Sequence, residues 1–123
     1  MDAKHILLIE DDEQFRNYLE EVLKSEGFNV STAADGQQGY DSAMENKPDL
    51  MITDLLMPEK DGVRLITEIK QAYPDLNIIA MSGGQSVFSP AFLEAAQSLG
   101  ANYTLDKPFM EDQLLELIEK CLS

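Results

Sequence analysis

The sequence predicts an α/β fold in which a parallel sheet is covered by helices on both faces. Three short apolar runs, at residues 6–9, 50–53 and 78–81, support this prediction. None of the runs alternates polar with apolar residues, which is typical of central parallel strands that are buried on both sides. Segments with helical periodicity separate the runs, and a repeated order of strand and helix favours right-handed crossovers.

Two weaker strands and five helices complete the predicted pattern of five strand–helix units. Residues 28–32 alternate in polarity, which indicates an edge strand, and residues 102–105 form a weaker fifth strand. Asp35 and Gln38 resemble a capping box, and Ser89 followed by Pro90 resembles a helix start. The helices are predicted from apolar stripes at Phe15, Leu19, Val22 and Leu23; Tyr40, Ala43 and Met44; Ile66, Ile69 and Tyr73; Phe92, Ala96 and Leu99; and Leu114, Leu115, Ile118 and Leu122.

Length and charge restrict the classes of function that the chain can serve. Its 123 residues predict one domain spanning residues 1–123. The net charge of −14 argues against direct binding of nucleic acid or of an anionic membrane surface, because both need basic residues. Cys121 is the single cysteine, and the sequence has no signal peptide or membrane-spanning run. We therefore expect a cytoplasmic protein that binds a cation or a protein partner.

Acidic residues follow two of the apolar runs, where ligands bind in open parallel sheets. Glu10 and Asp11 follow the first run, and Asp54 follows the run at residues 50–53. If these strands are neighbours about 4.8 Å apart, the carboxylates crowd together and require a counter-charge. Mg²⁺ suits such oxygen ligands, and Lys107 offers a fixed cation after the fifth strand. A carboxylate between two cations is well prepared to attack phosphorus.

Each of these residues also has a structural interpretation. Asp12 is better explained as the N-cap of the first helix than as a metal ligand. Ser82 precedes two glycines at a strand end, which favours contact with an anion over capping of a loop. Lys107 precedes a proline at the same edge, so a role in the site is preferred to that of a surface lysine.

Four segments resemble the receiver domains of two-component response regulators. They are residues 8–13 (LIEDDE), 54–62 (DLLMPEKDG), 81–83 (MSG) and 99–109 (LGANYTLDKPF). Each segment lies at the end of a predicted strand, and together the resemblance covers about residues 4–122. It implies a flavodoxin-like, doubly wound five-stranded parallel sheet of order 2-1-3-4-5.

The resemblance also implies a function for individual residues. Asp54 would accept a phosphoryl group from the phosphohistidine of a sensor histidine kinase or a phosphotransfer protein, and a downstream protein would read the change. Asp11 would bind Mg²⁺ directly together with Asp54 and the backbone carbonyl of Leu56, whereas Glu10 would act mainly through water. Ser82 and Lys107 would contact phosphoryl oxygens, and the Lys107–Pro108 peptide bond would be cis. Such a domain is not an enzyme acting on other substrates, because it catalyses only its own phosphorylation and dephosphorylation.

The fifth strand departs from the pattern of the family at one position. The family usually carries an aromatic residue four positions after the glycine that is Gly100 here, but this chain has Thr104, and Tyr103 lies one residue earlier. Because successive strand residues point to opposite faces, Tyr103 cannot replace that ring. We therefore expect a switch of Ser82 and Thr104 without a large aromatic movement, and an output from residues 83–90 near Phe88 and Phe92.

Three alternatives share parts of this pattern. A flavin or nucleotide module would need a glycine-rich phosphate loop where the acids at positions 10–13 stand. A phosphohydrolase with Asp54 as nucleophile would commonly carry a second Asp where Leu56 stands. A degenerate receiver that only binds partners is disfavoured by the complete set of acids, hydroxyl and lysine.

Overall fold

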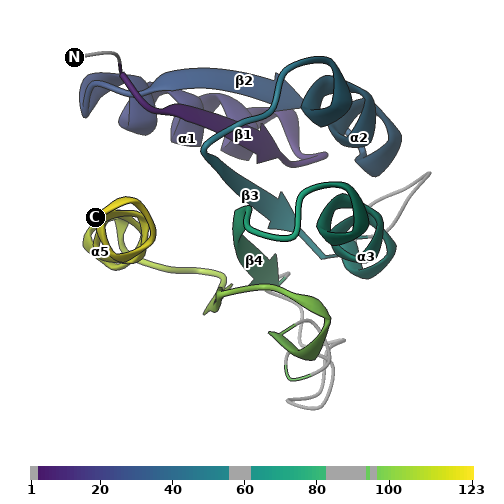
Figure 1. The fold of residues 1–123 in the computed structure, drawn as a ribbon. Helices are drawn as coiled ribbons and strands as arrows, with labels where there is room; N and C mark the ends of the chain where they lie inside the picture. Colours follow the sequence, from purple (N-terminus) through teal and green to yellow (C-terminus); the bar gives the residue numbers. More distant parts are fainter. Residues whose placement is uncertain (1–2, 56–61, 83–93, 95–96) are drawn as a thin grey trace.

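The computed structural model describes residues 3–55, 62–82, 94 and 97–123, and it contains one five-stranded sheet (Figure 1). Neighbouring strands are parallel, and their spatial order is β2-β1-β3-β4-β5. The structure therefore confirms the α/β class predicted from the periodicity and the strand order implied by the resemblance. The strands are β1 (His5–Ile9), β2 (Asn29–Ala33), β3 (Leu50–Asp54), β4 (Asn77–Ser82) and β5 (Tyr103–Asp106).

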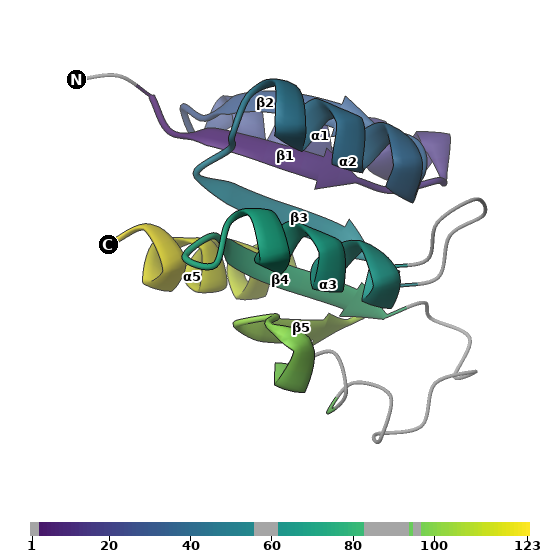
Figure 2. The same ribbon diagram turned by 45° about the vertical axis from the view of Figure 1, so that its right-hand side comes forward.

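Helices cover both faces of the sheet (Figure 2). Helices α2 (Gly36–Glu45) and α3 (Gly62–Ala72) lie on one face, and α1 (Glu13–Ser25) and α5 (Glu111–Leu122) lie on the other. Two apolar clusters result, because the central strands send alternate side chains to opposite faces. Leu7 and Ile9 of β1 pack with α2 and α3, whereas Ile6 and Leu8 pack with α1 and α5.

Strands β1, β3 and β4 are almost wholly buried, as their continuous apolar runs predict. Strand β2 lies at an edge of the sheet and is only partly buried, in agreement with its alternating sequence. The fifth strand begins and ends one residue later than predicted, so Asp106 is its last residue. This shift has a consequence for the functional site, since it brings Asp106 into register with Ser82.

Polar side chains fix the starts of the first two helices. Asp12 caps α1, because its Oδ1 accepts hydrogen bonds from the backbone N–H groups of Gln14 and Phe15 at 3.0 and 3.2 Å. Asp35 caps α2 by accepting from the N–H of Gln38 at 2.8 Å. The Gln38 side chain accepts from the N–H of Ala34, one residue before the position that a regular capping box uses.

The fourth predicted helix lies mostly outside the described residues. Residues 97–99 are helical, whereas its predicted start at Ser89 and Pro90, together with Phe88 and Phe92, is not described. Among the helices that are described, none is long and apolar enough to span a bilayer.

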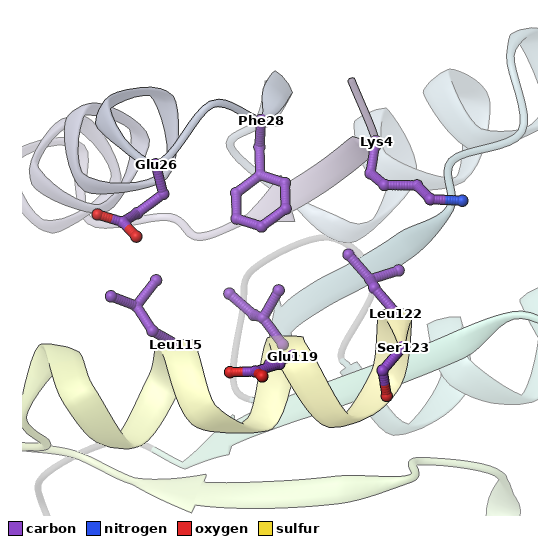
Figure 3. A pocket seen from close by; sticks show the side chains of 8 residues that line it. Lys4, Glu26, Phe28, Leu115, Glu119, Leu122 and Ser123 are labelled. Carbon is purple, nitrogen blue, oxygen red and sulfur yellow. The ribbon is translucent and has the colours of Figure 1, made fainter. Parts of the chain in front are cut away.

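A pocket opens at the amino ends of β1 and β2, at the opposite edge of the sheet from the acidic residues (Figure 3). Phe28 faces Leu115 and Leu122 of α5 across it, and Lys4 and Glu26 lie at its sides. Since Lys4 precedes β1 and Glu10 follows it, the length of a strand separates this pocket from the acids.

Candidate functional site

The carboxyl ends of β1, β3, β4 and β5 meet at one edge of the sheet (Figure 2). The parallel register places Ile9 beside Thr53, and Asp54 beside Met81. Glu10 therefore leaves β1 next to the end of β3, as the sequence predicts. Glu10, Asp54 and Ser82 are buried polar residues, with exposed fractions of 1%, 4% and 5%, so their partners decide what this edge can do.

Lys107 joins the two buried carboxylates. Its Nζ lies 2.5 Å from Glu10 Oε1 and 3.1 Å from Asp54 Oδ2. The lysine follows β5 directly and is itself only 16% exposed, so water screens these ion pairs weakly. One fixed cation thus serves two anions, which confirms the expected proximity of Glu10, Asp54 and Lys107.

Burial and charge shift the pKa values of this group in a consistent way. Desolvation raises the pKa of Glu10 to about 7, and its hydrogen bonds with Lys107 and Asp12 only partly oppose the rise. Burial lowers the pKa of Lys107, but the carboxylates of Glu10 and Asp54 outweigh it, and the net pKa is raised. The lysine therefore stays charged, whereas Glu10 shares this cation with Asp54 and bears the cost of burial.

The geometry fits a divalent cation that prefers oxygen ligands. Carboxylate oxygens of Glu10, Asp11 and Asp54 lie within 4.8 Å of one another. The ligand oxygens of one octahedral Mg²⁺ ion lie roughly 2.9 to 4.1 Å apart, so these three carboxylates would draw closer together around a bound ion. Asp11 is exposed, which leaves room for the water molecules that Mg²⁺ retains. Asp12 is engaged in capping α1, as its structural interpretation predicts.

Ser82 lies at this edge, but its hydroxyl is directed to Asp106, to which no role was assigned from the sequence. Its Oγ donates a hydrogen bond to Asp106 Oδ1 at 2.7 Å. The backbone N–H of Lys107 also donates to the Ser82 carbonyl at 3.3 Å, which ties the ends of β4 and β5 together. The Asp106 contact depends on strand register, so composition and spacing alone could not reveal it.

Thr104 and Tyr103 lie on opposite faces of β5. Thr104 is in register with Ala80, which belongs to the cluster with α2 and α3. Tyr103 is in register with Ile79 and packs against the cluster with α1 and α5. This register agrees with the expectation that Tyr103 and Thr104 point to opposite faces, so that Tyr103 does not replace a ring at position 104.

The backbone near Asp54 is closely packed by the start of α3. The Gly62 N–H donates to the Leu55 carbonyl at 2.9 Å, and a Cβ at position 62 would lie 2.3 Å from the Asp54 carbonyl oxygen. Only glycine fits this approach. The implied third protein ligand of the metal, the carbonyl of Leu56, falls outside the described residues.

Two residues of α1, Phe15 and Arg16, make contacts at the site that were not predicted. The Phe15 ring lies 4.7 Å from Lys107 Nζ, a cation–π geometry, and it meets the Phe109 ring edge-on at 5.8 Å. Arg16 Nη1 donates to the Glu10 carbonyl at 2.9 Å. In the sequence Phe15 is one member of an apolar stripe. Its position in the first turn of α1, directly after the acidic residues, is the only sequence feature that indicates a contact with the site.

The raised pKa of Glu10 predicts a pH-dependent stability in the metal-free protein. Between about pH 4.5 and 7, Glu10 keeps its proton in the folded state, whereas in the unfolded chain its pKa has the ordinary value of 4.5 and the proton is released. The contribution of protonated Glu10 to the free energy of unfolding is fully present below about pH 4.5 and is lost as the pH rises through about 7. Glu10→Gln keeps the hydrogen-bonding shape without the charge, so we expect it to exceed the wild type by about 2 kcal/mol at pH 8 and by much less at pH 5.

Urea unfolding with a chelator at the two pH values measures this difference. Glu21→Gln, on the exposed face of α1, is the matched control and should change little at either pH. A Glu10→Gln effect of the same size at pH 5 and pH 8 would contradict the assignment of the shift to this residue.

Comparison with known proteins agrees with the geometry. The family model of the response regulator receiver domain matches residues 6–119. The chain is 36% identical to the chemotaxis protein CheY of Bacillus subtilis, over 98% of this chain and 99% of that protein. The structure of a putative response regulator from Chloroflexus aurantiacus superimposes with a TM-score of 0.90 at 29% identity, covering 98% of both chains.

Other relatives are longer proteins. The transcriptional regulatory protein RprY of Bacteroides fragilis is 35% identical over 99% of this chain but only 51% of its own length. For CpxR of Escherichia coli the identity is 34%, over 95% of this chain and 48% of that protein. The chain thus spans about half the length of these regulators. The matched family model, the strand order and the acids gathered around Lys107 lead to one conclusion: the chain belongs to the response regulator receiver domain family.

Proposed function

We propose that Asp54 accepts a phosphoryl group from the phosphohistidine of a sensor histidine kinase or a phosphotransfer protein. The observation that carries this proposal is the arrangement of Asp54 beside Lys107, with Glu10 and Asp11 completing an acidic cluster. A carboxylate oxygen of Asp54 attacks phosphorus, and the new O–P bond forms as the P–N bond breaks. The electron pair of that bond stays on the imidazole nitrogen of the donor, and Asp54 becomes an acyl phosphate.

Lys107 and the acidic cluster have distinct parts in this transfer. Lys107, held at 3.1 Å from Asp54 Oδ2, neutralises negative charge on the transferred group and orients the carboxylate. The cluster of Glu10, Asp11 and Asp54 would hold Mg²⁺, which supplies further neutralisation of the phosphoryl oxygens when bound. The chain would transfer phosphoryl groups only to itself, in the cytoplasm, and present the change to a downstream protein through Ser82 and Thr104.

The test is incubation of the protein with acetyl phosphate and Mg²⁺, followed by intact-mass measurement. We expect one added phosphoryl group in the wild type and none in Asp54→Asn, which keeps the shape of the side chain but removes the nucleophilic charge. A product of full yield from Asp54→Asn would overturn the assignment.

Two further measurements test the role of the metal. A chelator should prevent the modification, and Asp11→Ala should need more Mg²⁺ than Glu10→Ala, since Asp11 is the exposed ligand expected to bind directly. The protein has no tryptophan, so Mg²⁺ affinity is measured by NMR titration. Equal affinities of wild type and Asp11→Ala would exclude direct ligation by Asp11.

A further inference from the structure

Ser82 and Asp106 form a side-chain pair at the end of the sheet. The two residues are in register as the last members of β4 and β5, so their side chains project to the same face. The Ser82 hydroxyl donates to Asp106 Oδ1 at 2.7 Å, a short bond to a carboxylate of the kind that is stronger than one between neutral groups. Ser82 is 5% exposed, so little water competes for its hydrogen.

A serine hydroxyl has a single hydrogen to donate. It cannot serve Asp106 and an oxygen of a phosphoryl group on Asp54 at the same time. We propose that Asp106 is a positioning residue that holds Ser82 away from the phosphoryl site and releases it when Asp54 is phosphorylated. The proposal rests on the proposed function of Asp54, and it makes Asp106 a determinant of how readily the phosphorylated conformation forms.

The surroundings of the pair make this exchange feasible. A phosphoryl group brings about −1.5 to −2 charges and three strong acceptor oxygens, so it competes well for the hydroxyl. Asp106 is exposed, and water can replace the bond that its carboxylate loses. The backbone bond from Lys107 N–H to the Ser82 carbonyl does not involve either side chain. Rotation of the Ser82 side chain can therefore break its bond to Asp106 while the backbone bond between β4 and β5 stays intact.

Beryllofluoride with Mg²⁺, an analogue of the phosphoryl group, provides the test, with affinity measured by NMR titration. Asp106→Ala frees Ser82 and should bind beryllofluoride about tenfold more tightly than the wild type. Asp106→Asn has lost the charge but keeps an oxygen that accepts from Ser82, so its gain should be clearly smaller. Thermal unfolding of each variant verifies that it is folded.

Ser82→Ala separates the hydrogen bond from the charge of Asp106. In the Ser82→Ala background, the change of Asp106 to alanine should leave the affinity unaltered, because no hydroxyl remains to be released. A gain that persists at full size in this background, or that is equal in Asp106→Asn and Asp106→Ala, would show a mere charge effect and overturn the proposal. Equal affinities of wild type and Asp106→Ala would overturn it as well.

The same experiment separates this proposal from the proposed function. If the wild type takes up neither beryllofluoride nor a phosphoryl group from acetyl phosphate, the role of Asp54 fails and this inference fails with it. If the wild type takes up both and the Asp106 variants match it, only the role of Asp106 is refuted.

Discussion

Lys107→Met is expected to lower the free energy of unfolding of the metal-free protein by about 3 kcal/mol at pH 8. The methionine keeps most of the apolar volume of the side chain but removes its charge. Glu10, at 1% exposure, and Asp54 then face one another without the cation that now lies 2.5 and 3.1 Å from them. The loss reflects an uncompensated buried charge rather than the net worth of the ion pair.

Urea unfolding measures this effect, and two further variants test whether the buried charge causes it. Lys120→Met removes an exposed lysine of α5 whose ion pair with Glu116 spans 3.6 Å, and it should cost less than about 0.5 kcal/mol. The double variant Glu10→Gln Lys107→Met should recover part of the lost stability, because it removes one of the two buried negative charges and their mutual repulsion, while Asp54 remains without the lysine. Equal losses from Lys107→Met and Lys120→Met would show that the buried pair has no special role.

Gly62→Ala is the second change with a large expected effect, again about 3 kcal/mol of destabilisation. The added Cβ would lie 2.3 Å from the Asp54 carbonyl oxygen and 2.5 Å from Leu55 Cα. Both are backbone atoms, so no side-chain rotation relieves the contact, and α3 must move away from the end of β3. The shift also displaces Asp54, and we expect slower uptake of a phosphoryl group from acetyl phosphate.

Gly39→Ala is the matched control for this prediction. Its Cβ would approach Ile9 Cδ1 at 2.5 Å and Ile9 Cγ1 at 2.8 Å, but both are side-chain atoms, so repacking of Ile9 can relieve the contact without moving the backbone. The alanine also favours the helix α2, so the net cost should be about 1–2 kcal/mol and smaller than that of Gly62→Ala. A loss of stability in Gly39→Ala as large as that in Gly62→Ala would contradict the importance of the backbone contact.

Much of the fold follows from the sequence because burial leaves a strong pattern. Strands β1, β3 and β4 are enclosed on both faces, and uninterrupted apolar runs are typical of that environment. Strand β5 is only half-buried, so its pattern is weak and its bounds are shifted by one residue. The partner of Ser82 lies at the shifted position, which is why the bond to Asp106 was not foreseen.

The predicted site follows from one topological rule. Parallel strands joined by right-handed crossovers bring their carboxyl ends to one edge, so Glu10, Asp54 and Lys107 had to meet there. The rule places backbones but does not orient side chains. It could not show that Lys107 binds Glu10 more closely than Asp54, or that the Phe15 ring lies beside the lysine. Such contacts depend on how α1 packs against the edge, which the periodicity of its apolar stripe does not specify.

The ion pair between Lys107 and Glu10 joins residues that are 97 positions apart in the chain. During synthesis Glu10 emerges early, and its cation follows only after every strand of the sheet has been made. In a nascent or partly unfolded chain the acids thus lack their contact with the lysine. Contacts of such long sequence separation form late, because loop closure must precede them. The phosphoryl acceptance proposed for Asp54 should therefore appear only together with the complete fold.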